Sequence, residues 1–273
     1  MQNNLRKILE FLMAAVILLL SYYLPGKCLE MADMELVRES MAEGGSREAE
    51  NKEEGNKEEE NKEDAGNGKM ENGAVDDNTA GGTSGIILID PGHGGDDPGM
   101  VGIDGIKEKT LNLKIAQKLA NLLEQKGYTV VLTREEDAGL YEEGTANHKA
   151  QDMQRRCALI EEHKPLVTVS IHQNSYTDAA VYGPQVFYFE HSPEGEKLAA
   201  CIQTQMNTLL EIERPRSIKA NLNYYILKRS PSVTALVECG FLSNPGDVSK
   251  LITEEYQDRV AEAVCAGILE YLQ

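Results

Sequence analysis

Two histidines and two glutamates in this 273-residue chain carry side chains that can bind a metal ion or transfer a proton, and each stands at the edge of a predicted strand or helix. They are His93, Glu108, His172 and Glu238. Three of them follow apolar runs typical of buried strands, and Glu108 opens a helical pattern. The ends of parallel strands meet at one edge of a sheet, so we expect the four side chains to converge.

The loop that holds His93 has unusually little side-chain bulk. The apolar run 86–89 ends in an Asp-Pro pair, and four glycines follow between positions 92 and 99. Glycine and proline impose turns and leave space around their neighbours. A metal ion, a substrate or a second protein group can therefore approach the His93 ring.

Two imidazoles and one carboxylate form a ligand set that suits Zn²⁺ and leaves a fourth position for water. Such an ion lowers the pKa of its water toward about 7. Cleavage of an amide also needs a group that takes a proton from water and passes it to the departing nitrogen, and a carboxylate beside the ion can do both. We expect Glu238, after its apolar approach 235–237, to take that role, and Glu108 to be a ligand with His93 and His172.

Apolar runs alternate with amphipathic segments from residue 85 to residue 273, which indicates one α/β domain. The expected strands are 86–89, 128–133, 166–171, 185–189, 224–227 and 233–237. The expected helices are one that begins near Glu108 and stops at Gly127, then 152–162, 194–210 and 256–272. We therefore predict a mixed, mostly parallel sheet of about six strands with helices on both faces, and we expect a monomer.

The first 28 residues resemble an export segment. Arg6 and Lys7 precede the apolar run 8–24, which has the length of a signal-peptide core or of a single membrane span of roughly 17–25 residues. Both interpretations, a cleaved signal peptide and a retained membrane anchor, stay open. Either one places the rest of the chain outside the cytoplasm, in the cell wall or anchored to the membrane facing outward.

Residues 29–84 are predicted to be a disordered acidic linker. Between positions 30 and 83 there are 17 acidic and 6 basic residues, and the five-residue near-repeat at 50–64 has almost nothing apolar. Such a composition cannot offset the entropy that ordering costs. The chain as a whole has a net charge of −18, which argues against nucleic-acid binding. Its five cysteines are widely spaced without a C-x-x-C pair, so we expect neither a disulfide framework nor a thiolate zinc site.

Three motifs and their order make a family resemblance visible. They are Asp90-Pro-Gly-His-Gly-Gly95, Ser170-Ile-His-Gln-Asn174 and Val237-Glu-Cys-Gly-Phe-Leu-Ser-Asn-Pro245, with Glu108 and its helix between the first two. From about residue 86 to residue 272 the chain resembles the zinc-dependent N-acetylmuramoyl-L-alanine amidases of bacterial cell-wall metabolism, amidase type 3. The resemblance implies that His93, Glu108 and His172 bind zinc, that Glu238 is catalytic, and that the substrate is the amide between muramic acid and L-alanine in peptidoglycan.

Within that family, the compact catalytic domain and the segment Asn221-Leu-Asn-Tyr-Tyr-Ile-Leu227 resemble the germination-specific branch of spore-forming bacteria. Those enzymes remove peptides so that a partner polysaccharide deacetylase can form the muramic δ-lactam of spore cortex. Some relatives insert an autoinhibitory helix between the second histidine and the catalytic strand. This chain has ordinary strand and helix patterns there, which implies an open site.

Several polar residues near the predicted site have two interpretations. Asn174 and Asn244 are candidates for substrate binding, but loop-forming asparagines would have the same pattern. For at least one of Arg155 and Arg156 we expect a solvated helix face with an ion pair. The three remaining histidines lie in polar stretches, and we expect them at the surface: His148, His163 and His191.

Two other functions fit the same residues. One is a zinc peptidase that cuts the stem peptides of peptidoglycan. The other is a wall-binding module that has lost catalysis, although all four chemical residues are present.

Overall fold

The computed structural model describes residues 85–273. The export segment expected at residues 1–28 and the acidic linker expected at residues 29–84 lie outside the described residues. Within residues 85–273, no helix combines the length and the apolar character that crossing a membrane requires.

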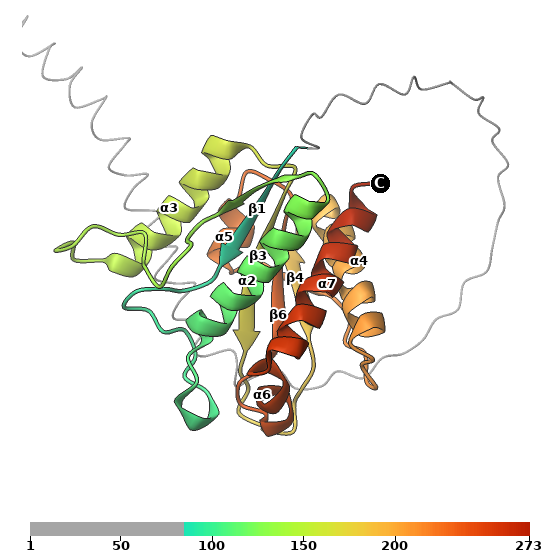
Figure 1. Cartoon of the computed structure of the whole chain (residues 1–273). Helices are drawn as coiled ribbons and strands as arrows, with labels where there is room; N and C mark the ends of the chain where they lie inside the picture. The colour runs from blue at the N-terminus through green and yellow to red at the C-terminus, as the bar shows by residue number, and fades with distance from the viewer. Residues whose placement is uncertain (1–84) are drawn as a thin grey trace, which may run out of the picture.

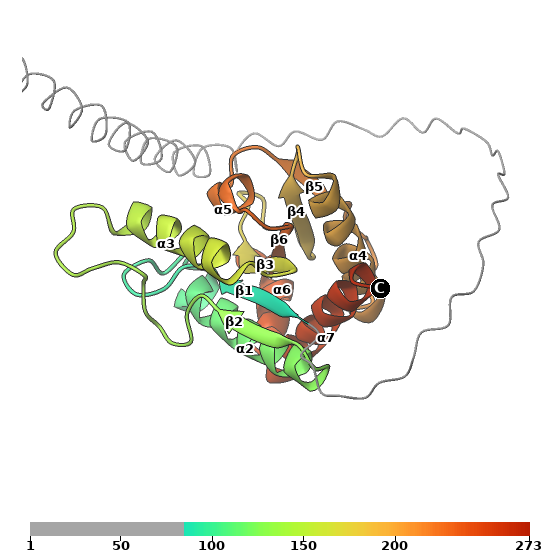
Figure 2. The ribbon, with the colours of Figure 1, turned by 90° about the horizontal axis from the view of Figure 1, so that it is seen from above.

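A six-stranded sheet forms the centre of the domain, with the strand order β2-β1-β3-β6-β4-β5 (Figures 1 and 2). The strands are β1 (Ile86–Pro91), β2 (Thr129–Leu132), β3 (Val167–Asn174), β4 (Gln185–Phe189), β5 (Lys219–Asn221) and β6 (Thr234–Phe241). Every neighbouring pair is parallel except β4 and β6, which are antiparallel. This arrangement confirms the predicted mixed, mostly parallel sheet.

Helices cover both faces of the sheet, as Figure 2 shows from above. One face carries α2 (Glu108–Gln125), α4 (Pro193–Leu209) and α7 (Glu254–Tyr271), and the other carries α3 (His148–His163) and α5 (Tyr225–Arg229). The domain also contains two short helices, η1 (Ile103–Gly105) and α6 (Pro245–Leu251). The sequence patterns predicted neither of them.

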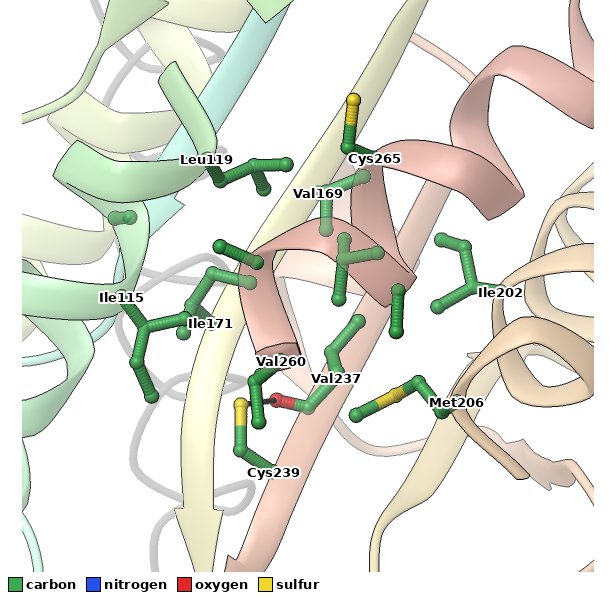
Figure 3. Close-up of a cluster of buried hydrophobic side chains, with 14 of the residues drawn as sticks. Ile115, Leu119, Val169, Ile171, Ile202, Met206, Val237, Cys239, Val260 and Cys265 are labelled. Carbon is green, nitrogen blue, oxygen red and sulfur yellow. Dashed lines mark hydrogen bonds between the residues drawn. The ribbon is translucent and has the colours of Figure 1, made fainter. Parts of the chain in front are cut away.

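Alternating strand residues supply two separate cores. Ile87 and Ile89 of β1 belong to the larger core under α2, α4 and α7, part of which is drawn in Figure 3. Leu88 belongs to the smaller core under α3 and α5. Because side chains alternate along a strand, the unbroken apolar run of β1 is buried on both faces, as predicted.

The helix boundaries follow capping residues more closely than hydrophobic spacing. Helix α3 begins four residues before the expected 152–162, because the Asn147 side chain accepts a hydrogen bond from the Ala150 N–H. Ser192 caps α4 and Thr253 caps α7 in the same way. The expected bounds of α4 (194–210) and α7 (256–272) differ from the observed bounds by only one or two residues at each end.

The strand predicted at residues 224–227 is wrong, because this segment forms helix α5. The Asn221 side chain accepts hydrogen bonds from the N–H groups of Asn223 and Tyr224, which turns the chain out of β5. Tyr225 and the two residues after it are all buried, between α3 and strands β4 and β6. A short apolar run does not distinguish a buried strand from one buried helical turn.

The contact between α4 and α7 depends on a glycine. A Cβ atom at Gly267 would collide with the backbone of Ile202 on α4. We predict that Gly267→Ala destabilises the domain by about 1–3 kcal/mol, the usual cost of overpacking, although alanine has the higher helix propensity.

Denaturant unfolding of the variant measures this cost, and Glu262→Ala on the exposed face of the same helix is the control. A Gly267→Ala protein as stable as wild type would contradict the close packing of these helices.

Candidate metal site and cleft

The sheet brings His172 and Glu238 together at the edge where β1, β3 and β6 end. The two residues are directly opposite each other in the parallel pairing of β3 and β6, so their side chains lie on the same face. Both strands continue for two or three residues beyond them, to Asn174 and Phe241. The sequence pattern predicted that these residues come just after their strands, whereas in the structure they are part of the strands, near the ends.

His93, Glu108 and His172 converge at this edge, as predicted. His93 Nε2 lies 3.2 Å from Glu108 Oε2, and His172 Nδ1 lies 3.0 Å from Glu108 Oε1. One ligand atom from each of the three residues lies within 4.8 Å of the others, which is close enough to hold one metal ion. The two imidazole rings meet edge to face, with centroids 5.1 Å apart.

The Glu108 carboxylate is buried, with 3% of its surface exposed, and it is surrounded by donors. The Met100 N–H donates to Oε2 at 2.8 Å, while the Asn112 amide and the Gln173 N–H donate to Oε1 at 3.2 and 3.1 Å. Burial alone would raise the pKa of Glu108, but the charge of His93 and hydrogen bonds from both histidines hold it well below its usual range. The group is therefore a fixed anion.

A second carboxylate orients His93. Its Nδ1 lies 2.9 Å from Asp97 Oδ2, which leaves Nε2 directed toward Glu108. Burial lowers the pKa of His93, but Glu108 and Asp97 raise it more, to about 10. Two carboxylates thus favour positive charge at this position, and an orienting carboxylate behind a histidine is the usual outer partner of a metal ligand.

Two glycines make the space that the candidate ligands occupy. A Cβ atom at Gly92 would collide with the His172 ring. A Cβ atom at Gly99 would lie 2.5 Å from Glu108 Oε2 and 2.7 Å from Cδ2 of His93. The expectation that glycines leave room around His93 is confirmed, and the room is filled by Glu108 and His172.

A buried ion pair holds the loop that carries His93. Arg156 of α3, only 1% exposed, donates to Asp90 Oδ1 at 2.5 Å and to Asp152 Oδ2 at 2.6 Å. It also donates to the carbonyls of Pro91 and His93, at 2.9 and 2.8 Å. Burial by itself would raise the pKa of Asp90, but Arg156 and two hydroxyl donors have the larger, opposite effect and lower it to about 2.

A second arginine holds the same loop from the other side. Arg134, just after β2, donates to the carbonyls of Pro91, Gly92 and Lys109 at 2.9, 3.1 and 2.8 Å. Burial and the nearby charge of Arg156 lower the pKa of Arg134 to about 10. These carbonyl contacts fix the backbone on both sides of His93, whose own φ of 64° is in the left-handed region that non-glycine residues rarely adopt.

The three candidate ligands line a cleft of about 710 Å³ together with Glu238. One wall contains Tyr141 and His148, and another contains Tyr224, Tyr225 and Ile226 at the start of α5. Glu238 is 6% exposed and is not part of the three-residue ligand group. An acid thus stands beside the candidate ligands with access to the same open space.

Other residues singled out in the sequence take different places. Asn174 lines the cleft, whereas Asn244 does not; its side chain caps α6 by accepting from the Asp247 N–H and donates to the Ala179 carbonyl. These are the contacts of a loop-forming asparagine. Arg155 is the exposed member of its pair and contacts Glu142 at 2.5 Å, as expected for a solvated ion pair, while Arg156 is buried.

The three remaining histidines are exposed or partly exposed, as expected, and one of them also lines the cleft. His148 is part of the cleft wall, where its ring stacks on Tyr141 at 4.1 Å and its Nδ1 lies 3.2 Å from Asp96 Oδ2. His191 is exposed, and His163 is partly exposed at the end of α3. A histidine that begins a helix in a polar stretch gives no sequence signal that the helix start faces a cleft.

Sequence reasoning missed the residues that support the ligands, above all Asp97, Asn112 and Arg134. Asp97 is four residues after His93, and Asn112 is one helical turn after Glu108, so both spacings were available as signals. Arg134 offered none, because its four acceptors are backbone carbonyls.

The fold and the site define an α/β protein whose sheet edge carries a His-Glu-His metal-binding group beside a fourth carboxylate. A family model described as N-acetylmuramoyl-L-alanine amidase matches residues 87–270. The chain therefore belongs to the N-acetylmuramoyl-L-alanine amidase family.

Individual relatives agree with this assignment. The germination-specific N-acetylmuramoyl-L-alanine amidase of Bacillus subtilis (strain 168) is 38% identical over 189 residues, which cover 68% of this chain and 79% of that protein. The structure of the CwlD amidase from Clostridioides difficile in complex with the GerS lipoprotein matches with a TM-score of 0.67 and 36% identity, over 69% of this chain and 98% of that one. An amidase structure from Clostridium difficile 630 matches with a TM-score of 0.62 and 35% identity, over 70% and 98% of the two chains.

The neighbouring arginines of α3 provide a matched test of the buried ion pair. We predict that Arg156→Met destabilises the domain by about 3–5 kcal/mol, because it leaves the Asp90 carboxylate buried without its cation. Arg155→Met removes only an exposed pair and is expected to change the stability by less than about 0.5 kcal/mol. Denaturant unfolding at neutral pH measures both.

The ion pair also has a defined pH dependence. The pKa of Asp90 lies below its ordinary value of 3.8, so the pair contributes fully above about pH 4 and its contribution falls as the pH drops toward 2. The deficit of Arg156→Met should shrink over that range, and equal losses for the two methionine variants at neutral pH would contradict the role of Arg156.

Proposed function

We propose that this chain hydrolyses the amide bond between N-acetylmuramic acid and L-alanine in peptidoglycan with the help of a bound Zn²⁺. The observation that carries the proposal is the convergence of His93, Glu108 and His172 beside Glu238 in one open cleft. Membership of the amidase family supplies the substrate class and the bond.

The residues of the site fit a zinc ion. Two imidazole nitrogens and one carboxylate oxygen are a common catalytic zinc set with a position left open. Asp97 behind His93 and the N–H donors around Glu108 hold these ligands in place, and Gly92 and Gly99 leave their space free. When bound, the ion polarises the carbonyl of the scissile amide and makes water more acidic.

Glu238 is the proposed proton carrier. It is next to His172 across the β3 and β6 pairing, outside the ligand group, and it lines the cleft. In that position its carboxylate accepts a proton from the attacking water and donates it to the nitrogen of L-alanine as the bond breaks. Proton transfer to the amine is required because an unprotonated amide nitrogen is a poor leaving group.

Asn174 is the proposed substrate-binding residue among the two asparagines. It lines the cleft at the end of β3, two residues after His172, and its amide is within reach of a polar group on a bound glycan or peptide. Asn244 is a candidate for the same role by its sequence pattern, but the contacts of its side chain with α6 and with Ala179 support a role in shaping the loop beside the cleft.

We place the activity in spore cortex, outside the cytoplasm. Support comes from the 38% sequence identity to a germination-specific amidase and from the structural similarity to the CwlD amidase. In that setting the peptide-free muramic acid would be the substrate of a polysaccharide deacetylase, and the muramic δ-lactam would follow. A lipoprotein partner, as in the CwlD–GerS complex, is a further expectation, and residues 8–24 would provide export or a membrane anchor.

Product analysis tests the reaction. Purified peptidoglycan incubated with the full chain is expected to release peptides that begin with L-alanine, and a chelator should abolish the release until zinc is added back. Mass spectrometry identifies the new ends. New ends within the stem peptides would indicate a zinc peptidase instead, and binding to sacculi without cleavage would indicate a wall-binding module.

Two variants separate the ligands from the proton carrier. Glu238→Gln is expected to keep about one zinc per chain and to lose activity by at least roughly a hundredfold, because general acid and base catalysis is lost. His172→Ala should lose both the metal and the activity. Metal analysis and turnover on the same preparations check both, and a fully active Glu238→Gln protein would exclude the role given to Glu238.

A further inference from the structure

The residues at the site follow a fixed order along the sheet edge. His93 comes after β1, His172 is on β3, Glu238 is on β6, and Gln185 is directly opposite Glu238 at the start of β4. In the proposed function Glu238 protonates the amine that leaves, so we expect the peptide on the Glu238 side of the site, toward β4 and β5, and the glycan on the side of β1.

Gln185 connects Glu238 to a cation beyond it. Its Oε1 accepts a hydrogen bond from Arg216 Nε at 3.3 Å, and its amide donates to the Ser217 carbonyl at 2.9 Å. The Arg216 guanidinium also stacks over the ring of Phe241, 5.2 Å from the ring centroid. Phe241 ends β6, so Arg216 lies at the same edge of the sheet as the metal site.

A second cation lies next to the first. Lys219, the first residue of β5, is paired with Phe187 of β4, and its Nζ is 5.9 Å from the centroid of that ring. Phe187 is two residues after Gln185 and opposite Leu236, which lines the cleft. Lys219 therefore projects from the face of the sheet that carries Glu238.

Neither cation is within ion-pair distance of a carboxylate in the part of the chain that the structure describes, although Arg216 feels the charge of Asp247. Both are half-buried, yet residues 85–273 offer no ion pair to either. Burial lowers the pKa of Arg216 by more than the charge of Asp247 raises it, and burial together with the charge of Arg216 lowers the pKa of Lys219. Two partly desolvated cations side by side in a chain of net charge −18 are a costly arrangement that a bound anion would relieve.

We propose that Arg216 and Lys219 bind a carboxylate of the peptide on the leaving side of the scissile bond. This inference rests on the proposed function. The released peptide carries at least its own terminal carboxylate, whereas the glycan backbone offers neutral hydroxyl and acetamide groups.

The reach of the peptide matches this position. Paired strand residues have Cα atoms about 5 Å apart, and Arg216 contacts the residue opposite Glu238. An extended peptide advances roughly 3.3–3.6 Å per residue. A carboxylate two or three residues beyond the scissile amide would therefore meet the cation pair.

The test compares two soluble muramyl peptides that differ only in charge, one with free carboxylates and one with the carboxylates converted to primary amides. The wild-type full chain is expected to have a KM about tenfold lower for the charged substrate, because a charge-assisted hydrogen bond is lost with the amide. Arg216→Gln and Lys219→Gln should each raise the KM for the charged substrate by about that factor. Neither should change the KM for the amidated substrate, the kcat or the zinc content.

Two further variants separate recognition from folding. Arg216→Lys keeps the charge and should retain most of the preference, and Arg214→Gln removes an exposed cation two residues away and should have no effect. The inference is overturned if wild type and Arg216→Gln have the same ratio of KM values for the two substrates, or if Arg216→Gln raises both KM values equally. Either result would leave the amidase activity intact. Cleavage of neither substrate by wild type would instead overturn the proposed function and this inference with it.

Discussion

The buried contact between Asp90 and Arg156 is the constraint on which the site depends. The arginine comes from α3 and the aspartate from the end of β1, so the pair joins the helix layer to the sheet where the His93 loop begins. A guanidinium has five N–H donors. In Arg156 those not used by carboxylates bind the carbonyls on both sides of the glycine that precedes His93. A left-handed backbone at a non-glycine residue costs of order 1–3 kcal/mol, and it persists only where the surroundings fix it.

The same principle extends to the candidate ligands. The Glu108 carboxylate receives N–H donors from Met100, Asn112 and Gln173, three segments that meet only in the folded domain. Such a group is ionised and immobile before any cation binds. At positions 92 and 99, any side chain larger than that of glycine would collide with the candidate ligands. Supporting contacts of this kind determine ligand geometry as much as the ligands themselves do.

The antiparallel pairing of β4 gives the cleft its direction. If β4 were parallel to β6, its start would lie at the opposite edge of the sheet, and Gln185 would not be opposite Glu238. The reversal brings the beginning of β4 and of β5 to the edge where β1, β3 and β6 end. The candidate metal ligands, the proposed proton carrier and the half-buried cations thus lie in sequence along one rim.

Much of the fold was predictable because it is recorded in local patterns. Unbroken apolar runs identified β1, β3 and β6, and helical spacing identified α2, α4 and α7, since burial on a regular element leaves a periodic trace. The segment 224–227 failed because four apolar or aromatic residues are too few to separate the two periods. Asn244 and the start of α3 show that capping side chains, which act over three residues, refine boundaries that hydrophobic spacing leaves open.

The sequence by itself determined that two histidines and two glutamates stand at the ends of elements that a parallel sheet gathers, together with the glycines that leave room for them. Only the tertiary structure decided which groups support them. Arg156 pairs with a residue 66 positions away, His148 faces the cleft, and Arg216 meets Gln185 across 31 positions. A hydrogen bond between distant residues leaves no periodic mark along the chain, because it depends on where separate elements are packed and not on the pattern within either one.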